Sequence, residues 1–285
     1  MTIIHVYFII SIILLFIGSI LTAKAFQKYI RYFKESNFLI RSFITPLVAD
    51  TVCIINFLSR SISHLFFNNN NNNNIFCQIS ATLAVAHFLT LFCGHLFISF
   101  CTYKMTLGTR VSNKKILIYN IIFWLFGITY GVLLQSFKIL GNFEGLYCCI
   151  LKEQLNHILV MMITYICIII FFFTIFFYIM AYKVVKFRRN IVGVQNIIEQ
   201  IILKRGMMFF FSFIFCWSLM MYSLITKPFG YTNLKLEVEI VSAWMAKCMP
   251  IINSSILLRL FHIMEEKQKI NDENKQKYSP KLLSV

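Results

Sequence analysis

The sequence predicts an all-α membrane protein, a seven-transmembrane helix bundle with its N-terminus outside the cell and its C-terminus in the cytoplasm. Of its 285 residues, 59% are hydrophobic and only 13% are charged, about half the charged share of a soluble domain. Its mean hydropathy is +0.74. Such a chain has too few polar residues to cover a water-facing surface. Long apolar runs and an uneven distribution of Lys and Arg also indicate a membrane protein.

Seven apolar stretches reach the roughly 20 residues that a helix needs to cross a membrane. They cover residues 3–22, 38–58, 76–101, 116–135, 157–182, 207–226 and 238–258. Together they predict a bundle over residues 1–262, followed by a short polar cytoplasmic tail over residues 263–285. The first stretch is followed by a basic segment and lacks a basic start, so we expect a retained span rather than a cleaved signal peptide.

Basic residues set the predicted orientation, because Lys and Arg concentrate in cytoplasmic loops. The first, third and fifth connections are strongly basic: Lys24, Lys28, Arg31, Lys34; Lys104, Arg110, Lys114, Lys115; and Lys183, Lys186, Arg188, Arg189, Lys204, Arg205. The alternate connections contain few basic residues: Arg60, Lys138, Lys152, Lys227 and Lys235. The formal net charge of +16 therefore indicates topology and contact with membrane lipid, and we expect no nucleic-acid partner.

The connection between the second and third spans contains an asparagine tract over residues 68–74. A polar homopolymer cannot bury enough apolar surface to order itself. We expect this outer-loop insert to contribute little to function.

Two charged residues lie deep in the predicted spans, Asp50 in the second and Lys247 in the seventh. A charge in hydrocarbon is costly and normally faces the interior of a bundle, often with a partner. Counted from the span ends, both side chains fall near the middle of the membrane. One interpretation is a static ion pair between the two helices. The other is a polar switch or a counter-ion for a ligand.

The seventh span also contains a helix breaker and small polar side chains. Pro250 removes a backbone hydrogen bond, and Asn253, Ser254 and Ser255 follow it in "PIINSS". Such side chains can satisfy freed backbone groups in a kinked transmembrane helix. We therefore add Pro250 and Asn253 to the predicted polar switch; Pro46 makes the second span bendable in the same way.

The nine cysteines show no pair or spacing typical of a metal site. Cys77 lies at the outer end of the third span, and Cys148 and Cys149 lie in the next outer connection. All three face the oxidising side under the predicted topology, where a disulfide is stable. A bond from Cys77 to either neighbour would fix that loop over the bundle, and we favour Cys148.

Catalytic chemistry has little support in this sequence. We find no nucleophile and base in a recognisable arrangement, no phosphate-binding loop and no metal motif, so we expect neither an enzyme nor a bound metal or cofactor. His87, His95 and Trp217 are compatible with simple interior packing, and Glu239 lies at the outer end of the seventh span. That carboxylate could meet a cationic ligand or remain solvated.

Several segments, taken in order, resemble a G-protein-coupled receptor of the cyclic-AMP-receptor-like group, also called class E. "IFCQIS" resembles the entry to the family's third helix. "GLYCCI" resembles the Trp-Cys-Trp pattern of its second outer loop, with Tyr147, Cys148 and Cys149 in those places. "FFFSFIFCWSLMMYSLI" resembles its sixth helix, where Cys216 and Trp217 occupy the Cys-Trp pair.

The resemblance implies a plasma-membrane receptor that transmits an extracellular small-molecule signal to a heterotrimeric G protein. It places the ligand between the third, fifth, sixth and seventh helices, near His87, Trp217, Glu239 and Lys247. The implied G-protein contacts are Lys104, Arg110, Arg188, Arg189, Lys204 and Arg205. The family's polar Asn-Arg end of the sixth helix reads "MYSLI" here, so the resemblance does not specify cyclic AMP as the ligand.

Two alternatives remain open from the sequence. A small transporter or channel would use Asp50 and Lys247 as a coupling pair along a midplane pathway, although no inverted repeat supports it. A seven-helix protein with a structural or trafficking role is the other.

Overall fold

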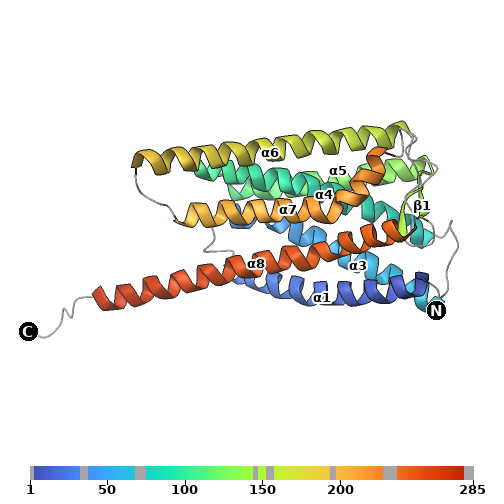
Figure 1. The fold of residues 1–285 in the computed structure, drawn as a ribbon, viewed down its shortest axis with the longest axis horizontal. Helices are drawn as coiled ribbons and strands as arrows, with labels where there is room; N and C mark the ends of the chain where they lie inside the picture. Colours follow the sequence, from blue (N-terminus) through green and yellow to red (C-terminus); the bar gives the residue numbers. More distant parts are fainter. Residues whose placement is uncertain are drawn as a thin grey trace, which may run out of the picture.

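The computed structural model describes residues 3–32, 38–67, 75–143, 147–151, 157–192, 197–226 and 236–278. Within these ranges lie seven long helices: α1 (Ile3–Tyr32), α3 (Ile44–Phe67), α4 (Ile75–Thr106), α5 (Asn113–Ser136), α6 (Ile158–Val192), α7 (Ile197–Thr226) and α8 (Leu236–Tyr278). A short helix, α2 (Phe38–Ser42), precedes α3, and strands β1 (Leu140–Phe143) and β2 (Tyr147–Ile150) follow α5. The long helices lie side by side in one elongated bundle (Figure 1).

The predicted class of helical membrane protein is confirmed. In the part of the chain that the structure describes, six helical stretches are long and apolar enough to cross a membrane: α1, α2 with α3, α4, α5, α6 and α8. Large apolar side chains are exposed around the bundle, such as Phe172 and Phe215, each 64% exposed. Such a surface suits lipid rather than water.

Helix α4 forms the centre of the bundle, with buried residues along its whole length. Small residues allow α5 to lie directly against it, as in small-xxx-small packing of membrane helices. A Cβ atom at Gly127 would come within 2.6 Å of the Ala86 carbonyl oxygen, and one at Gly131 within 2.9 Å of the Thr82 carbonyl oxygen. Any larger residue at these two glycines would force α5 away from α4.

The predicted second span is not one helix, because Pro46 divides it. Proline has no N–H and its ring clashes with the carbonyl four residues earlier. The chain accordingly turns at Phe43 between α2 and α3, and the Leu47 N–H donates to the Phe43 carbonyl at 3.2 Å. Pro46 thus lies in the first turn of α3, where proline is tolerated.

Several helices continue well beyond the predicted spans. Helix α1 continues to Tyr32 and includes Lys24, Lys28 and Arg31, and α8 continues through most of the predicted tail to Tyr278. Figure 1 shows α8 extending past the ends of α1 and α7. A span predicted from hydropathy ends where charged residues begin. A helix can continue into a polar region, because its backbone hydrogen bonds lie within the helix itself.

The two ends of the bundle differ in construction. At one end, which we call the hairpin end, β1 and β2 pair antiparallel with Leu140 opposite Ile150; the N-terminus lies at the same end of the bundle (Figure 1). The Leu151 N–H donates to the Ile139 carbonyl at 2.9 Å and extends this pairing. At the other end, which we call the basic end, lie the C-terminal turns of α1, α4 and α6. The asparagine tract over residues 68–74 lies outside the described residues.

Candidate functional site

Polar side chains buried between α1, α3, α7 and α8 form two groups inside an otherwise apolar bundle. We call the group nearer the hairpin end the Lys247 layer; it consists of Tyr7, Ser11, Arg60 and Lys247. We call the second group the Asp50 layer; it consists of Asp50, Ser212 and Asn253. Because buried charges are costly in an apolar interior, the partners of each charge decide what these layers can do.

Lys247 on α8 is 2% exposed and binds two hydroxyl groups of α1. Its Nζ donates to the Tyr7 hydroxyl at 2.5 Å and to the Ser11 hydroxyl at 2.7 Å. The ammonium also lies 4.1 Å from the centre of the Tyr7 ring and 5.6 Å from that of Phe57 on α3. The Ser11 hydroxyl in turn donates to the Tyr7 carbonyl at 2.7 Å. Lys247 is therefore held by neutral oxygens and aromatic faces.

Arg60 is the second cation of the Lys247 layer, and the sequence analysis placed it wrongly in a connecting loop. Helix α3 continues to Phe67, so Arg60 lies inside that helix and is only 2% exposed. Within the described ranges, its Nε and Nη2 atoms have no hydrogen-bond partner. Its guanidinium is close enough to the Tyr7 phenol to act on it electrostatically.

The Asp50 layer joins α3, α7 and α8 through side-chain hydrogen bonds. Asp50 is 1% exposed, and its Oδ2 accepts from the Asn253 amide nitrogen at 3.0 Å. The Asn253 amide oxygen accepts from the Ser212 hydroxyl at 3.4 Å. The other carboxylate oxygen, Oδ1, has no hydrogen-bond partner in the described part of the chain. A buried carboxylate thus depends on a single amide.

The ion pair considered for Asp50 and Lys247 does not form among the residues that the structure describes, since each has other partners. Helices α3 and α8 run antiparallel, and Asp50 lies level with Asn253. Lys247 lies six residues earlier on α8, roughly 9 Å along the axis at 1.5 Å per residue, beside Phe57. The two charges therefore lie at different levels of the bundle.

Pro250 lies inside α8, between the two layers. It provides no N–H to the Ala246 carbonyl, so α8 lacks one backbone hydrogen bond at that position. Gly18 on α1 faces it, and a Cβ atom there would lie 3.5 Å from the Pro250 Cβ. One turn further, the Thr22 and Ser254 hydroxyls share a hydrogen bond of 2.9 Å. The weakened point of α8 is thus packed closely against α1.

Two of the predicted ligand-binding residues contact each other beside the Lys247 layer. The ring centroids of His87 and Trp217 are 6.0 Å apart, and the Trp217 indole N–H donates to the Met249 sulfur at 2.9 Å. Phe57 lies against His87, with centroids 5.8 Å apart, and against Lys247 on its other side. Glu239, buried at 3% exposure, lies two turns before Lys247 on α8.

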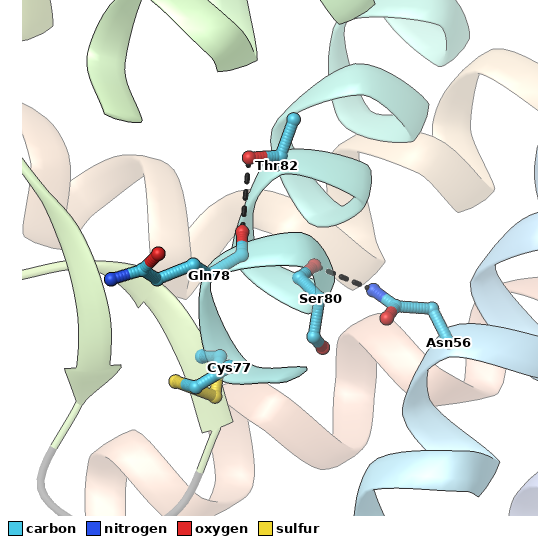
Figure 2. The surroundings of a disulfide bond; sticks show 6 residues. Asn56, Cys77, Gln78, Ser80 and Thr82 are labelled. Atoms are coloured by element: carbon cyan, nitrogen blue, oxygen red, sulfur yellow. Dashed lines mark hydrogen bonds between the residues drawn. A yellow bond between two sulfur atoms is a disulfide. The ribbon is translucent and has the colours of Figure 1, made fainter. Parts of the chain in front are cut away.

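A disulfide joins Cys77 in the first turn of α4 to Cys148 on β2, the partner that the sequence analysis favoured. Figure 2 shows this bond at the start of α4, close to Ser80, whose carbonyl accepts a hydrogen bond from the Asn56 amide nitrogen at 2.9 Å. The hairpin is thereby fixed to α4, and α4 to α3. The side chain of Cys149 lies outside the described residues.

Five of the six predicted G-protein contacts have described side chains, and they lie at the basic end. Arg110, Arg188 and Lys204 are exposed, and Lys104 lies 5.6 Å from the Phe100 ring centre. Arg205 differs, because it is only 8% exposed and its Nη1 donates to the Met208 sulfur at 3.3 Å. The side chain of Arg189 lies outside the described residues.

Among the described residues, no group of three or more His, Cys, Asp or Glu side chains could hold a metal ion. No protein-family model matches the sequence, and comparison with curated proteins finds no significant match. The function must therefore be argued from the arrangement of this chain's own residues.

Proposed function

We propose that this chain is a seven-transmembrane receptor of the cyclic-AMP-receptor-like kind, which transmits an extracellular small-molecule signal to a heterotrimeric G protein at the plasma membrane. The observation that carries the proposal is the disulfide from Cys77 to Cys148. It ties the start of the third long helix to the hairpin after the fourth, which is the arrangement implied by the resemblance of "IFCQIS" and "GLYCCI" to that family.

The predicted topology fits this proposal. Seven spans put the N-terminus and the hairpin on one side of the membrane and the C-terminus on the other. Basic residues gather at the basic end, on α1, α4, α6 and α7, as expected of a cytoplasmic face. The hairpin end would then be extracellular, where its disulfide is stable.

The polar layers supply a physical basis for switching. Helix α8 contacts α1 through Lys247 and contacts α3 through Asn253, with Pro250 between these contacts. A ligand that binds one arrangement of α8 better than another shifts the equilibrium toward it. Movement of α8 against α3 and α7 would change the basic end, where Lys104, Arg110 and Lys204 would contact the G protein.

A small transporter or channel is the second candidate. The observation that favours it is the buried Asp50 Oδ1, which has no hydrogen-bond partner among the described residues and could bind a passing cation or proton. The separate partners of Asp50 and Lys247 weaken the proposed coupling of these two charges. Ion currents or solute flux through proteoliposomes, abolished by Asp50→Asn, would favour this candidate.

The test of the receptor proposal is GTPγS binding in membranes that contain this chain and a panel of heterotrimeric G proteins. Nucleotides, amines and small carboxylates are added in turn to the unchanged protein, to Asp50→Asn and to a matched surface control, Glu266→Gln. We expect one compound class to stimulate exchange, and we expect Asp50→Asn to change that response while the control does not. Silence across the whole panel, in protein shown to reach the cell surface, would contradict the proposal.

A further inference from the structure

The second cation of the Lys247 layer points to the chemistry of the ligand, and this inference rests on the proposed receptor function. We propose that the ligand carries a carboxylate or phosphate group, which Arg60 and Lys247 bind between α1, α3 and α8. This position shares Lys247 with the one that the family resemblance implies, but it lies toward the first and second spans rather than toward the fifth and sixth.

Arg60 presents the edge that recognises such anions. Nε and Nη2 lie along one edge of the planar guanidinium, and together they can bind a carboxylate or phosphate through two parallel hydrogen bonds. Both atoms are buried without a partner in the described part of the chain. Buried donors are nearly always satisfied in proteins, so an edge left open in this way indicates a missing acceptor.

Lys247 adds a second positive charge to the same layer. An ammonium has three N–H donors, and two of them bind the Tyr7 and Ser11 hydroxyls. Both acceptors are neutral, and Asp50 is bound to Asn253 nearly two turns away. Glu239 contributes one negative charge on the same helix, so Arg60, Lys247 and Glu239 together retain a net charge of about +1. A monoanion would neutralise it.

Aromatic rings of α1, α3 and α8 pack in the same region and suggest what the rest of the ligand would be. The rings of Tyr7 and Trp244 stack with centroids 6.1 Å apart, and those of Phe8 and His64 with centroids 4.0 Å apart. Tyr7, Phe8, Ile240 and Ala243 form a buried apolar cluster beside them. An acid group attached to an aromatic or aliphatic body would match a pair of cations flanked by rings.

The first test measures the purified protein without any added ligand. An unpaired buried charge costs free energy of folding, so we expect Arg60→Met to raise Tm in detergent. The matched control, Arg259→Met, changes an exposed arginine of α8 and should leave Tm nearly unchanged. A lower Tm for Arg60→Met would show that Arg60 already has a structural partner, and would overturn the proposal.

The second test adds matched probes to the same protein: benzoate, phenylphosphonate and neutral benzamide. We expect one or both anions to raise Tm and benzamide to have no effect, with the anion shift lost in Arg60→Met and Lys247→Met but kept in Arg259→Met. The better of the two anions distinguishes a carboxylate ligand from a phosphate. A larger shift with dioctanoyl phosphatidate than with phenylphosphonate would identify a lipid headgroup as the anion's source. Equal shifts with benzoate and benzamide, no shift with any anion, or an anion shift that survives Arg60→Met would each overturn the proposal.

These tests separate the anion site from the receptor function. If an anion raises Tm through Arg60 but the protein never stimulates GTPγS binding, the anion site is supported and the receptor function is contradicted. If a neutral or cationic compound stimulates GTPγS binding and no anion raises Tm through Arg60, the receptor function is supported and the anion site is contradicted.

Discussion

The Lys247 layer and the Asp50 layer lie on the same two antiparallel helices, yet they treat buried charge in opposite ways. In the Asp50 layer one carboxylate is bound by the Asn253 amide, which links α3 to α8 and, through Ser212, to α7. In the Lys247 layer, Lys247 is bound by neutral hydroxyls and lies over aromatic rings, and the Nε–Nη2 edge of Arg60 has no acceptor within the described ranges. One layer connects helices, whereas the other has a surplus of donors.

This difference indicates a division of roles along α8. The Asp50 layer joins α3, α7 and α8 through hydrogen bonds between the protein's own side chains, although Asp50 Oδ1 has no partner among the described residues. The Lys247 layer gains most from a ligand, because an added anion would satisfy donors that the protein leaves open. Pro250 lies between the two, so a change at one layer can bend α8 relative to the other.

The largest effect is expected from removing the amide of the Asp50 layer. Asn253→Leu leaves a buried carboxylate without its donor, and leaving a buried acceptor unpaired costs about 1–3 kcal/mol, with more for a charged group. The free energy of unfolding, measured in detergent by SDS titration, should fall by that amount. In an Asp50→Asn background the same change should cost much less. An equal cost in both backgrounds would mean that Asn253 stabilises the protein through packing alone.

A smaller effect is expected from neutralising the other layer. Lys247→Met loses hydrogen bonds to two hydroxyls, each worth roughly 1 kcal/mol, but it also removes a buried charge that no carboxylate balances. The two changes nearly cancel, so the free energy of unfolding should change by about 1 kcal/mol or less in the same titration. A loss of several kcal/mol would indicate that Lys247 has an anionic partner within the protein.

The smallest effect is expected at the basic end, where an exposed pair joins α1 and α8. Lys28 Nζ lies 2.8 Å from Glu265 Oε1, with side chains 34% and 25% exposed. Water screens such pairs, which contribute from about 0 to 1 kcal/mol, although the Tyr32 hydroxyl also donates to Glu265 at 2.9 Å. Glu265→Gln should lower the free energy of unfolding by less than about 1 kcal/mol. A larger effect that persists in high salt would mean that this pair contributes as much as a buried layer.

Local sequence features were sufficient for the helical membrane class and for limiting the partner of Cys77 to Cys148 or Cys149. The first depends on runs of apolar residues and the second on the predicted side of the membrane, while the structure decides for Cys148. The positions of Arg60, Asp50 and Lys247 in the bundle could not be predicted from such local features. Arg60 was assigned to a loop because hydropathy windows stop at charged residues, whereas α3 continues past it.

The level of a buried charge in the bundle and its partners depend on how the helices pack against one another. A short stretch of sequence carries no information on that packing. Helices α3 and α8 pack with Asp50 beside Asn253 and with Phe57 beside Lys247, so the two charges do not face each other. Tyr7, the partner of Lys247, lies 240 positions away in the chain. Tyr7 and Ser11 lie four residues apart on one face of the first span, and this pair of hydroxyl groups was the available signal for that contact.

The most direct test of this account is a double-mutant cycle on Asp50→Asn and Lys247→Met, because the account requires the two buried charges to act in separate layers. At roughly 9 Å and an effective dielectric constant of about 20, Coulomb's law gives a coupling of at most about 2 kcal/mol. We expect the measured coupling in the free energy of unfolding to stay below that value. A coupling of about 3 kcal/mol or more would show a direct ion pair, and would contradict the separation of the two layers.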